Sequence, residues 1–181
     1  MEFPRPAVRP RLTDVAVAVA TLDRPEGLER CLKGVLAGET LPRELIVVDQ
    51  GTADVRSVVE LFALRPGVSV RHVRQARLGL SAFRNGAVRL TTSPILAFTD
   101  DDCVPEPGWL TAIAAAFQSS PQLGSVTGPM LPLGPPSGHL CGRVSGGNAA
   151  TGVLGVRAAV AAGDGREHDD EARLARSCRW L

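Results

Sequence analysis

The segment DVAVAVA, residues 14–20, decides the fold of this chain, because it is an unbroken run of small and β-branched apolar residues after its first aspartate. Such a run is typical of a parallel strand that is covered on both faces. A helical pattern follows, with Pro25 in its first turn and Asp23 in position to cap its N-terminus. One face of this helix collects apolar side chains at helical spacing, namely Leu28, Cys31, Leu32, Val35 and Leu36. The sequence therefore predicts a buried strand followed by a crossover helix.

The same unit recurs three more times along the chain. The further predicted pairs of strand and helix cover residues 44–49 and 55–64, 68–73 and 81–90, and 94–99 and 107–117. This alternation predicts an α/β fold, a Rossmann-like, doubly wound and mainly parallel sheet with helices on both faces. In such sheets ligands bind outside the carboxyl ends of the strands, so a functional site is expected there.

The chain divides into three predicted parts. Residues 1–13 hold three prolines and three arginines without an apolar core, and are expected to form a flexible N-terminal arm rather than a signal peptide. Residues 14–130 carry the repeated strand and helix pattern and form the predicted ligand-binding half. Residues 131–181 are expected to form a reduced or incomplete second half, with a strand within 146–156 and a charged helix over 167–178.

Composition and charge exclude several classes of protein. The 181 residues are 44% hydrophobic and 22% charged, with 20 Lys and Arg against 19 Asp and Glu, so the formal net charge is +1. A near-neutral chain has no general field that would hold nucleic acid, and no such partner is expected. No apolar stretch reaches the roughly 20 residues that span a bilayer. Four cysteines without a C-x-x-C pair favour a reducing compartment, so a cytoplasmic location is expected, with peripheral attachment to a membrane as an alternative.

The strongest chemical signal is TDDDC, residues 99–103, at the end of the fourth predicted strand. The sequence contains no GxxxxGK[ST] or GxGxxG loop, no GxSxG elbow and no HExxH motif. Three consecutive carboxylates repel one another unless a cation or a raised pKa relieves the repulsion. In an extended backbone Asp100 and Asp102 point to the same side and can bind one Mg²⁺ or Mn²⁺ ion, which would bridge to a diphosphate. The alternative is a solvated acidic turn.

Four segments, in this order and spacing, resemble the family 2 glycosyltransferases of GT-A fold: AVATLDRPEGLERCL, ELIVVDQGT, RLGLSAFRNGAVR and ILAFTDDDCVPEPGWL. The resemblance covers residues 14–130 and is specific as an ensemble. It implies a GT-A fold and a nucleotide-diphosphate sugar as the donor. It also implies an acceptor hydroxyl on a glycan, a lipid or a small molecule.

The resemblance implies roles for individual residues near the nucleotide. Thr21 and Asp23 match the first loop, which meets the base. Asp49 matches an acid of the second strand that faces the base, although Gln50 replaces the usual second aspartate. The Arg84 and Asn85 pair matches the RN of the third helix, near the nucleotide.

The resemblance also implies the metal site. Asp100 matches a residue at the ribose or the metal, Asp102 matches the metal ligand, and Asp101 lies between them beside the donor. Plainer roles stay open for three of the other residues. These are an N-cap for Asp23, a turn former for Asp49 and a surface helix residue for Arg84.

The tail REHDDEARLARSCRWL, residues 166–181, resembles the acidic cluster that supplies the base of this family. Glycosyl transfer with inversion needs a base that takes the proton of the acceptor hydroxyl. Two registers are open, one with the base at Glu167 and one with the base at Asp169, and Asp169 is preferred. The alternative is that these acids only complement the dipole of a helix.

The expected function is a metal-assisted, inverting glycosyltransferase. A nucleotide-sugar-binding remnant without turnover is an alternative. A phosphohydrolase is disfavoured, because it would need a nucleophilic aspartate after the first strand and a later lysine, whereas the only lysine is Lys33 in the first predicted helix.

Overall fold

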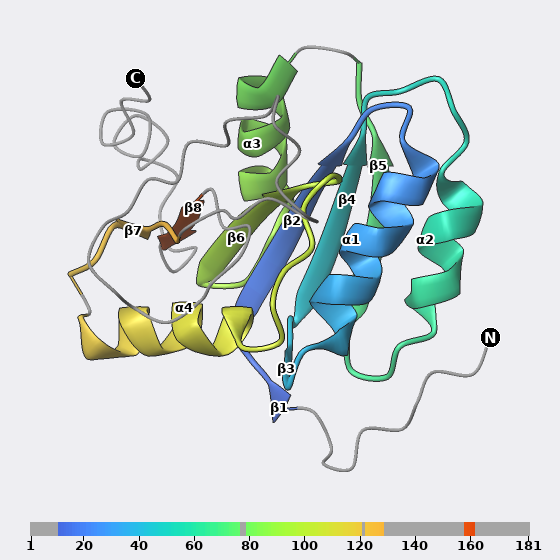
Figure 1. The fold of residues 1–181 in the computed structure, drawn as a ribbon. Helices are drawn as coiled ribbons and strands as arrows, with labels where there is room; N and C mark the ends of the chain where they lie inside the picture. Colours follow the sequence, from blue (N-terminus) through green and yellow to red (C-terminus); the bar gives the residue numbers. More distant parts are fainter. Residues whose placement is uncertain (1–10, 77–78, 121, 129–157, 162–181) are drawn as a thin grey trace, which may run out of the picture.

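A computed structural model of the chain describes residues 11–76, 79–120, 122–128 and 158–161 (Figure 1). Its strands are β1 (Arg11–Leu12), β2 (Val15–Thr21), β3 (Thr40–Leu41), β4 (Glu44–Asp49), β5 (Ser69–Arg74), β6 (Ile95–Asp100), β7 (Ser125–Val126) and β8 (Ala158–Ala161). Its helices are α1 (Pro25–Ala37), α2 (Arg56–Ala63), α3 (Gly79–Leu90) and α4 (Trp109–Ser119). None of these described helices is long and apolar enough to cross a membrane.

β2 lies at the centre of the main sheet. The strand order is β5-β4-β2-β6-β8-β7, and β2 pairs in parallel with β4 on one side and with β6 on the other. β5 continues the parallel pairing beyond β4, whereas β8 pairs antiparallel with β6 and β7 pairs antiparallel with β8. The chain leaves β2 in one direction and later returns to its other side, so the switch point of the topology lies between β2 and β6. The predicted mainly parallel α/β sheet is confirmed.

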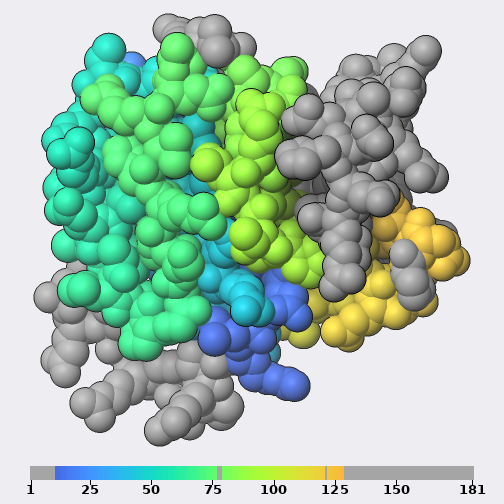
Figure 2. Space-filling model, turned by 180° about the vertical axis from the view of Figure 1, so that it is seen from behind, coloured from blue at the N-terminus to red at the C-terminus, as the bar shows by residue number. Residues whose placement is uncertain are grey.

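Helices cover both faces of this sheet, as the doubly wound prediction requires (Figure 1). The valines of β2 point to the face that α1, α2 and α4 cover, and the alanines of β2 point to the face that α3 covers. This division follows from the period of two along a strand. On the alanine face the rings of Phe83 and Phe98 meet edge to face, with their centroids 5.9 Å apart. Figure 2 is a view from behind, and the green side chains of the stretch that includes α3 lie over this face.

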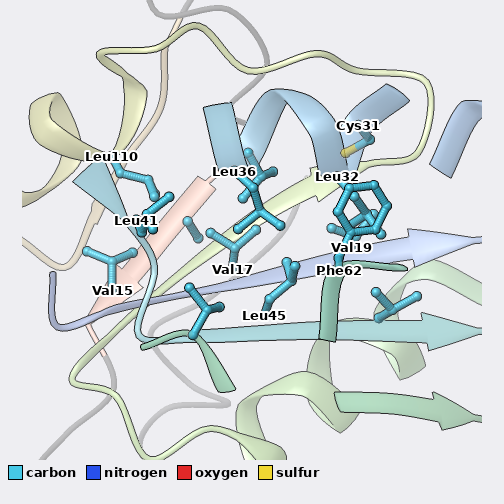
Figure 3. Packing of buried hydrophobic residues seen from close by; sticks show 14 of the residues in the cluster. Val15, Val17, Val19, Cys31, Leu32, Leu36, Leu41, Leu45, Phe62 and Leu110 are labelled. Atoms are coloured by element: carbon cyan, nitrogen blue, oxygen red, sulfur yellow. The ribbon is translucent and has the colours of Figure 1, made fainter. Parts of the chain in front are cut away.

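The larger core cluster lies on the valine face (Figure 3). Side chains from α1 pack onto the strands, and further leucine and phenylalanine side chains from β3, β4, α2 and α4 close the cluster. Complete burial of one such side chain stabilises the fold by about 1.5–3 kcal/mol. The following residues, labelled in Figure 3, are all at most 3% exposed: Cys31, Leu32, Leu36, Leu41, Leu45, Phe62 and Leu110.

The end of the expected flexible arm, residues 1–13, forms a short strand in the structure. Arg11 and Leu12 form β1, which pairs in parallel with β3 in the register Arg11 to Thr40. Backbone pairing of two residues leaves no periodic pattern in the sequence, which explains why it was not predicted. The predicted strand within 146–156 and the predicted helix over 167–178 lie outside the described residues.

A buried carboxylate joins three segments at the amino ends of the strands. Glu44 begins β4, and its side chain is 4% exposed. Its Oε2 lies 2.6 Å from Nη2 of Arg71 in β5, and its Oε1 accepts hydrogen bonds from the Ser93 hydroxyl at 2.7 Å and the Thr92 N–H at 3.0 Å. The hydroxyls of Thr91 and Thr92 donate to the same oxygen. Burial alone would raise the pKa of Glu44, but these hydrogen bonds outweigh it and lower the pKa.

Candidate functional site

The carboxyl ends of β2, β4 and β6 lie side by side at one edge of the sheet, at the top in Figure 1. We call the residues at this edge, 21–24, 49–53 and 100–103, the rim. In the strand register Thr21 lies beside Asp49, and Ala20 lies beside Asp100. The rim therefore brings together three segments that are far apart in the sequence. The predicted site residues on it are Thr21, Asp23, Asp49, Asp100, Asp101 and Asp102.

The three consecutive aspartates do not continue the strand. β6 ends at Asp100, and the N–H of Cys103 donates to the carbonyl of Asp100 at 3.1 Å, which closes a turn. The extended geometry expected for Asp100 and Asp102 is therefore wrong, because a turn removes the alternation on which it depended. Asp101 is 5% exposed, whereas the side chain of Asp102 is 60% exposed. The turn separates a buried carboxylate from an accessible one.

Asp101 joins the end of β6 to the end of β2. Its Oδ2 accepts a hydrogen bond from the Thr21 hydroxyl at 2.9 Å and one from the N–H of Leu22 at 3.4 Å. Thr21 is itself 3% exposed. These two side chains thus hold the strand ends together, and their expected contacts with a donor stay predictions.

Arg24 brings a positive charge to the aspartates. It lies at the start of α1, and its Nη1 is 3.1 Å from Oδ2 of Asp102 and 3.4 Å from Oδ1 of Asp101. The charge of Asp101, followed by the hydrogen bond with Asp102, raises the pKa of Arg24. The guanidinium therefore stays ionised beside the turn.

Two cysteines near the rim, Cys103 and Cys31, have a raised pKa. Sγ of Cys103 lies 3.7 Å from Oδ1 of Asp102. Burial, followed by the charges of Asp102 and Asp100, raises the pKa of Cys103, and burial raises the pKa of Cys31. A thiol that keeps its proton is a poor nucleophile and a poor metal ligand. The reactive groups of the described rim are therefore its carboxylates.

Asp49 is a buried acid on the rim, and it is 1% exposed. Its Oδ1 accepts a hydrogen bond from the N–H of Gly51 at 2.8 Å. Its Oδ2 lies 3.5 Å from Nε2 of His72 and 3.6 Å from Nε of Arg74. Within the described part of the chain, neither Asp49 Oδ2 nor His72 Nε2 has a hydrogen-bond partner. Both atoms are buried, and Oδ2 lies within ion-pair distance of His72 and Arg74, so Asp49 connects the end of β4 to β5.

Asp23 does not cap α1, so that alternative role is wrong. The N-cap position belongs to Arg24, and no side chain there bonds to the helix. Asp23 instead has a φ of 55°, and its Oδ1 accepts hydrogen bonds from the N–H of Thr52 at 2.6 Å and of Ala53 at 2.7 Å. Gly51 approaches so closely that an added Cβ would lie 2.6 Å from the Asp23 nitrogen. Asp23 therefore ties the loop after β2 to the loop after β4.

Replacement of Asp23 by alanine is expected to lower the free energy of unfolding by about 1–2 kcal/mol. The N–H groups of Thr52 and Ala53 would lose their acceptor, and alanine is disfavoured at a positive φ. Urea unfolding measures this loss. Asp23→Asn is the matched control, because asparagine keeps an acceptor oxygen and tolerates the left-handed conformation. Equal losses in the two variants would contradict the role given to these hydrogen bonds.

α3 places Arg84 against the sheet below the rim. Arg84 is partly buried, and its guanidinium carbon lies 5.9 Å from the centroid of the Phe98 ring. The neighbouring Asn85 is exposed. Nε2 of Gln50 donates to the carbonyl of Gly79 at 3.4 Å, which connects the loop after β4 to the start of this helix. Arg84 is thus more enclosed than a surface residue, and the expected contacts of both residues with a nucleotide stay predictions.

Asp102 has the chemistry that suits Mg²⁺ or Mn²⁺. In the described ranges no three His, Cys, Asp or Glu residues are grouped so that they could hold a metal ion. Mg²⁺, however, is commonly held by one or two carboxylates, with water and substrate phosphates as its other ligands. The Arg24 guanidinium beside Asp101 and Asp102 is a stand-in cation, which indicates that positive charge is favoured at this position. The residues present therefore fit a hard divalent cation held through Asp102.

Sequence reasoning missed two contributors to the rim. One is Arg24, which follows the first predicted strand, whereas three aspartates follow the fourth. Both strands end at the same edge of the sheet, so the sequence could have predicted that this arginine lies near the aspartates. The other is His72 of β5, which lies next to the rim, because the pairing of β4 with β5 brings it beside Asp49. The two candidates for the base, Glu167 and Asp169, lie outside the described residues.

Comparison with known proteins places this chain among transferases. A family model described as glycosyl transferase family 2 matches residues 16–132. The chain is 29% identical over 119 residues to the glucosyl-dolichyl phosphate glucuronosyltransferase of Haloferax volcanii, and 30% identical over 118 residues to the validoxylamine A glucosyltransferase of Streptomyces hygroscopicus subsp. limoneus. These alignments cover 65% and 62% of this chain, and 38% and 26% of the two relatives. The chain thus spans well under half the length of these curated relatives.

Solved structures agree with the family match. The mannosyltransferase PcManGT from Pyrobaculum calidifontis, in complex with GDP-Man and Mn²⁺, is 30% identical with a TM-score of 0.55, covering 69% of this chain and 37% of its own. S. aureus TarS 1–349 in complex with UDP-GlcNAc is 21% identical with a TM-score of 0.51, covering 58% of this chain and 32% of its own. Because its identity is low, the match to TarS supports the fold alone. Together with the sheet order, these matches confirm the predicted GT-A fold.

Proposed function

The chain belongs to glycosyl transferase family 2, and we propose that its rim holds the donor of a reaction that moves a sugar from a nucleotide-diphosphate sugar to an acceptor hydroxyl. The observation that carries this proposal is the placement of buried Asp49 and exposed Asp102 on one edge of the sheet. Such a donor has a hydrogen-bonding base at one end and a charged diphosphate toward the other. The rim has an enclosed acid at the end of β4 and an accessible carboxylate after β6.

The base of the donor is proposed to lie at Asp49. The N–H of Gly51 donates to Oδ1 of this residue, and Oδ2 lies 3.5 Å from Nε2 of His72 and 3.6 Å from Nε of Arg74, so an N–H of the base would replace one of these contacts at Oδ2. Nη2 of Arg74 donates to the carbonyl of Gly51 at 2.7 Å, which supports the loop on which this contact depends. Asp23 fixes the same loop from the other side. Together these residues hold the loop beside which the base is proposed to lie.

The diphosphate is proposed to lie near Asp102, which would hold Mg²⁺ or Mn²⁺. When bound there, the ion would neutralise the charge of the departing nucleoside diphosphate. The structural relative PcManGT was solved with GDP-Man and Mn²⁺, which supports a divalent cation for this chain. Asp101 keeps the ends of β2 and β6 together next to Asp102, and the turn leaves the side chain of Asp102 exposed.

The acceptor is proposed to be a hydroxyl of a glycan, a lipid or a small molecule. Transfer with inversion requires a base on the far side of the donor sugar from the diphosphate. We assign this role to Asp169, with Glu167 as the alternative, on the family resemblance of the tail.

Titration calorimetry with UDP and with GDP, each with and without Mn²⁺, tests the donor site. At least one nucleoside diphosphate is expected to bind, and Mn²⁺ is expected to raise its affinity about tenfold or more, since an ion held by Asp102 would neutralise the charge of the phosphates. Asp102→Ala is expected to lose most of this increase. The proposal would be contradicted if the affinity for UDP and GDP did not change with Mn²⁺ and was the same in Asp102→Ala as in the wild type.

A turnover assay separates a transferase from a domain that only binds the donor. The chain is incubated with a nucleotide sugar that carries whichever nucleotide, UDP or GDP, binds in the titration. Release of the nucleoside diphosphate is then followed over time. Continued release, by transfer or by slow hydrolysis, supports the enzyme. A donor that stays bound and intact supports the alternative of a nucleotide-sugar-binding remnant.

A further inference from the structure

The guanidinium of Arg24 lies beside the exposed carboxylate of Asp102. Its Nη1 lies 3.1 Å from Oδ2 of Asp102, and the same nitrogen lies 3.4 Å from Oδ1 of Asp101. The side chains of Arg24 and Asp102 are 59% and 60% exposed, so this ion pair can open without disturbing the core. Asp101 is buried and keeps its bonds to β2 when Arg24 moves. One arginine thus bridges the accessible and the enclosed carboxylate.

The backbone keeps Arg24 within reach of the aspartate turn. The preceding residue, Asp23, has a positive φ and is held through Oδ1 by the N–H of Thr52. One helical turn later, Gly27 allows α1 to pack against the turn, since an added Cβ would lie 3.0 Å from the carbonyl oxygen of Asp101. The start of α1 is therefore fixed beside the aspartates, and only the side chain of Arg24 needs to move.

We propose that Arg24 is a resident counter-ion of the aspartate turn, which a divalent cation must displace from Asp102 in order to bind there. The inference rests on the proposed function, because it takes this cation to be the one that assists the donor. Before the cation binds, the guanidinium relieves the repulsion between the carboxylates of Asp101 and Asp102. A guanidinium and a divalent cation on one carboxylate repel each other, so each weakens the binding of the other.

The diphosphate of the donor resolves this competition. Guanidinium groups bind phosphate oxygens through paired N–H donors, so a diphosphate beside Asp102 offers Arg24 a new partner. The cation and the nucleoside diphosphate are then expected to bind together more tightly than either binds alone. Arg24 thus acts as a positioning residue. It weakens binding of the divalent cation alone and strengthens binding of the cation together with the donor.

Binding of Mn²⁺ alone, measured on the full chain by electron paramagnetic resonance of the free ion, tests this inference. Arg24→Gln is expected to bind Mn²⁺ about fivefold more tightly than the wild type, the upper range for loss of an exposed ion pair. Arg24→Lys keeps the charge and is expected to stay near the wild type. Arg43→Gln is the matched control, because Arg43 forms a similarly exposed ion pair with Asp14 at 2.8 Å, away from the rim. Its Mn²⁺ affinity is expected to be unchanged.

The same titration in saturating UDP or GDP provides the second arm. With the nucleotide present, Arg24→Gln is expected to bind Mn²⁺ no more tightly than the wild type, or more weakly. The reason is that the diphosphate in this variant has lost its guanidinium partner. The inference is overturned if Arg24→Gln binds bare Mn²⁺ no better than the wild type, or if neither protein binds it. Failure of the proposed function is distinguishable, since it appears as missing nucleoside diphosphate binding rather than as a change in Mn²⁺ affinity.

Discussion

Replacement of Asp102 by asparagine is expected to lower sugar transfer by about 10²–10³-fold, the range for loss of a group that stabilises developing charge. The variant keeps the size of the side chain and one carbonyl oxygen but removes the charge that would attract a divalent cation. Since the proposed ion acts on the departing diphosphate, turnover should fall, and the gain in donor affinity with Mn²⁺ should fall with it. Steady-state kinetics over a range of donor and Mn²⁺ concentrations measures both effects.

Asp14→Asn is the control for the Asp102 variant. Asp14 is another exposed carboxylate paired with an arginine, Arg43, and it directly precedes β2, at the opposite end of this strand from the rim. Its replacement should leave turnover unchanged. The unfolding free energy of Asp102→Asn should stay within about 0.5 kcal/mol of the wild type, as for most surface substitutions. Undiminished transfer by Asp102→Asn would refute the role given to this carboxylate.

Replacement of Glu44 by alanine is expected to lower the free energy of unfolding by about 2–4 kcal/mol. The buried Oε1 accepts hydrogen bonds from Ser93, Thr92 and Thr91, and Oε2 pairs with Arg71, which is itself partly exposed. Removal of the carboxylate leaves these donors without their acceptor. Chemical denaturation at neutral pH measures the loss.

The stability that Glu44 contributes should also depend on pH. Its pKa is lower in the folded chain than its ordinary value of 4.5. The ionised form therefore stabilises the fold fully above the unfolded-state pKa, and this contribution is lost as the pH falls through the lower folded-state pKa. The difference in unfolding free energy between the wild type and Glu44→Gln should narrow on acidification. Glu29→Gln, which breaks an i,i+4 pair with Lys33 on α1, should cost only about 0.5 kcal/mol at neutral pH.

The sheet could be predicted from the sequence because its strands are buried on both faces. β4 begins and ends at the predicted residues, and β2, β5 and β6 are each displaced by one. A continuous apolar run bounded by polar residues determines such a strand locally, and the order of alternation then limits the topology. Pairing of β1 with β3 was missed, because two-residue strands carry no pattern of their own.

The arrangement of the site could be predicted only in part. The sequence places carboxylates at the strand ends, but the conformation of the turn after Asp100 determines that Asp101 is enclosed and Asp102 exposed. A positive φ at Asp23 likewise depends on hydrogen bonds from a loop 29 residues away. These features come from contacts between distant segments, and neither propensity nor spacing encodes them.

The close contact between Asp23 and Gly51 also limits how this protein can be recombined with its relatives. An added Cβ at Gly51 would overlap the backbone nitrogen of Asp23, and the carboxylate of Asp23 is bonded to the next two residues of that loop. Grafting of either loop from a relative must therefore transplant residues 22–24 and 50–53 as a pair. In a chimera whose crossover falls between β2 and β4, the two loops come from different proteins. Each loop is then intact, but the close contact between position 23 and the loop after β4 is not preserved.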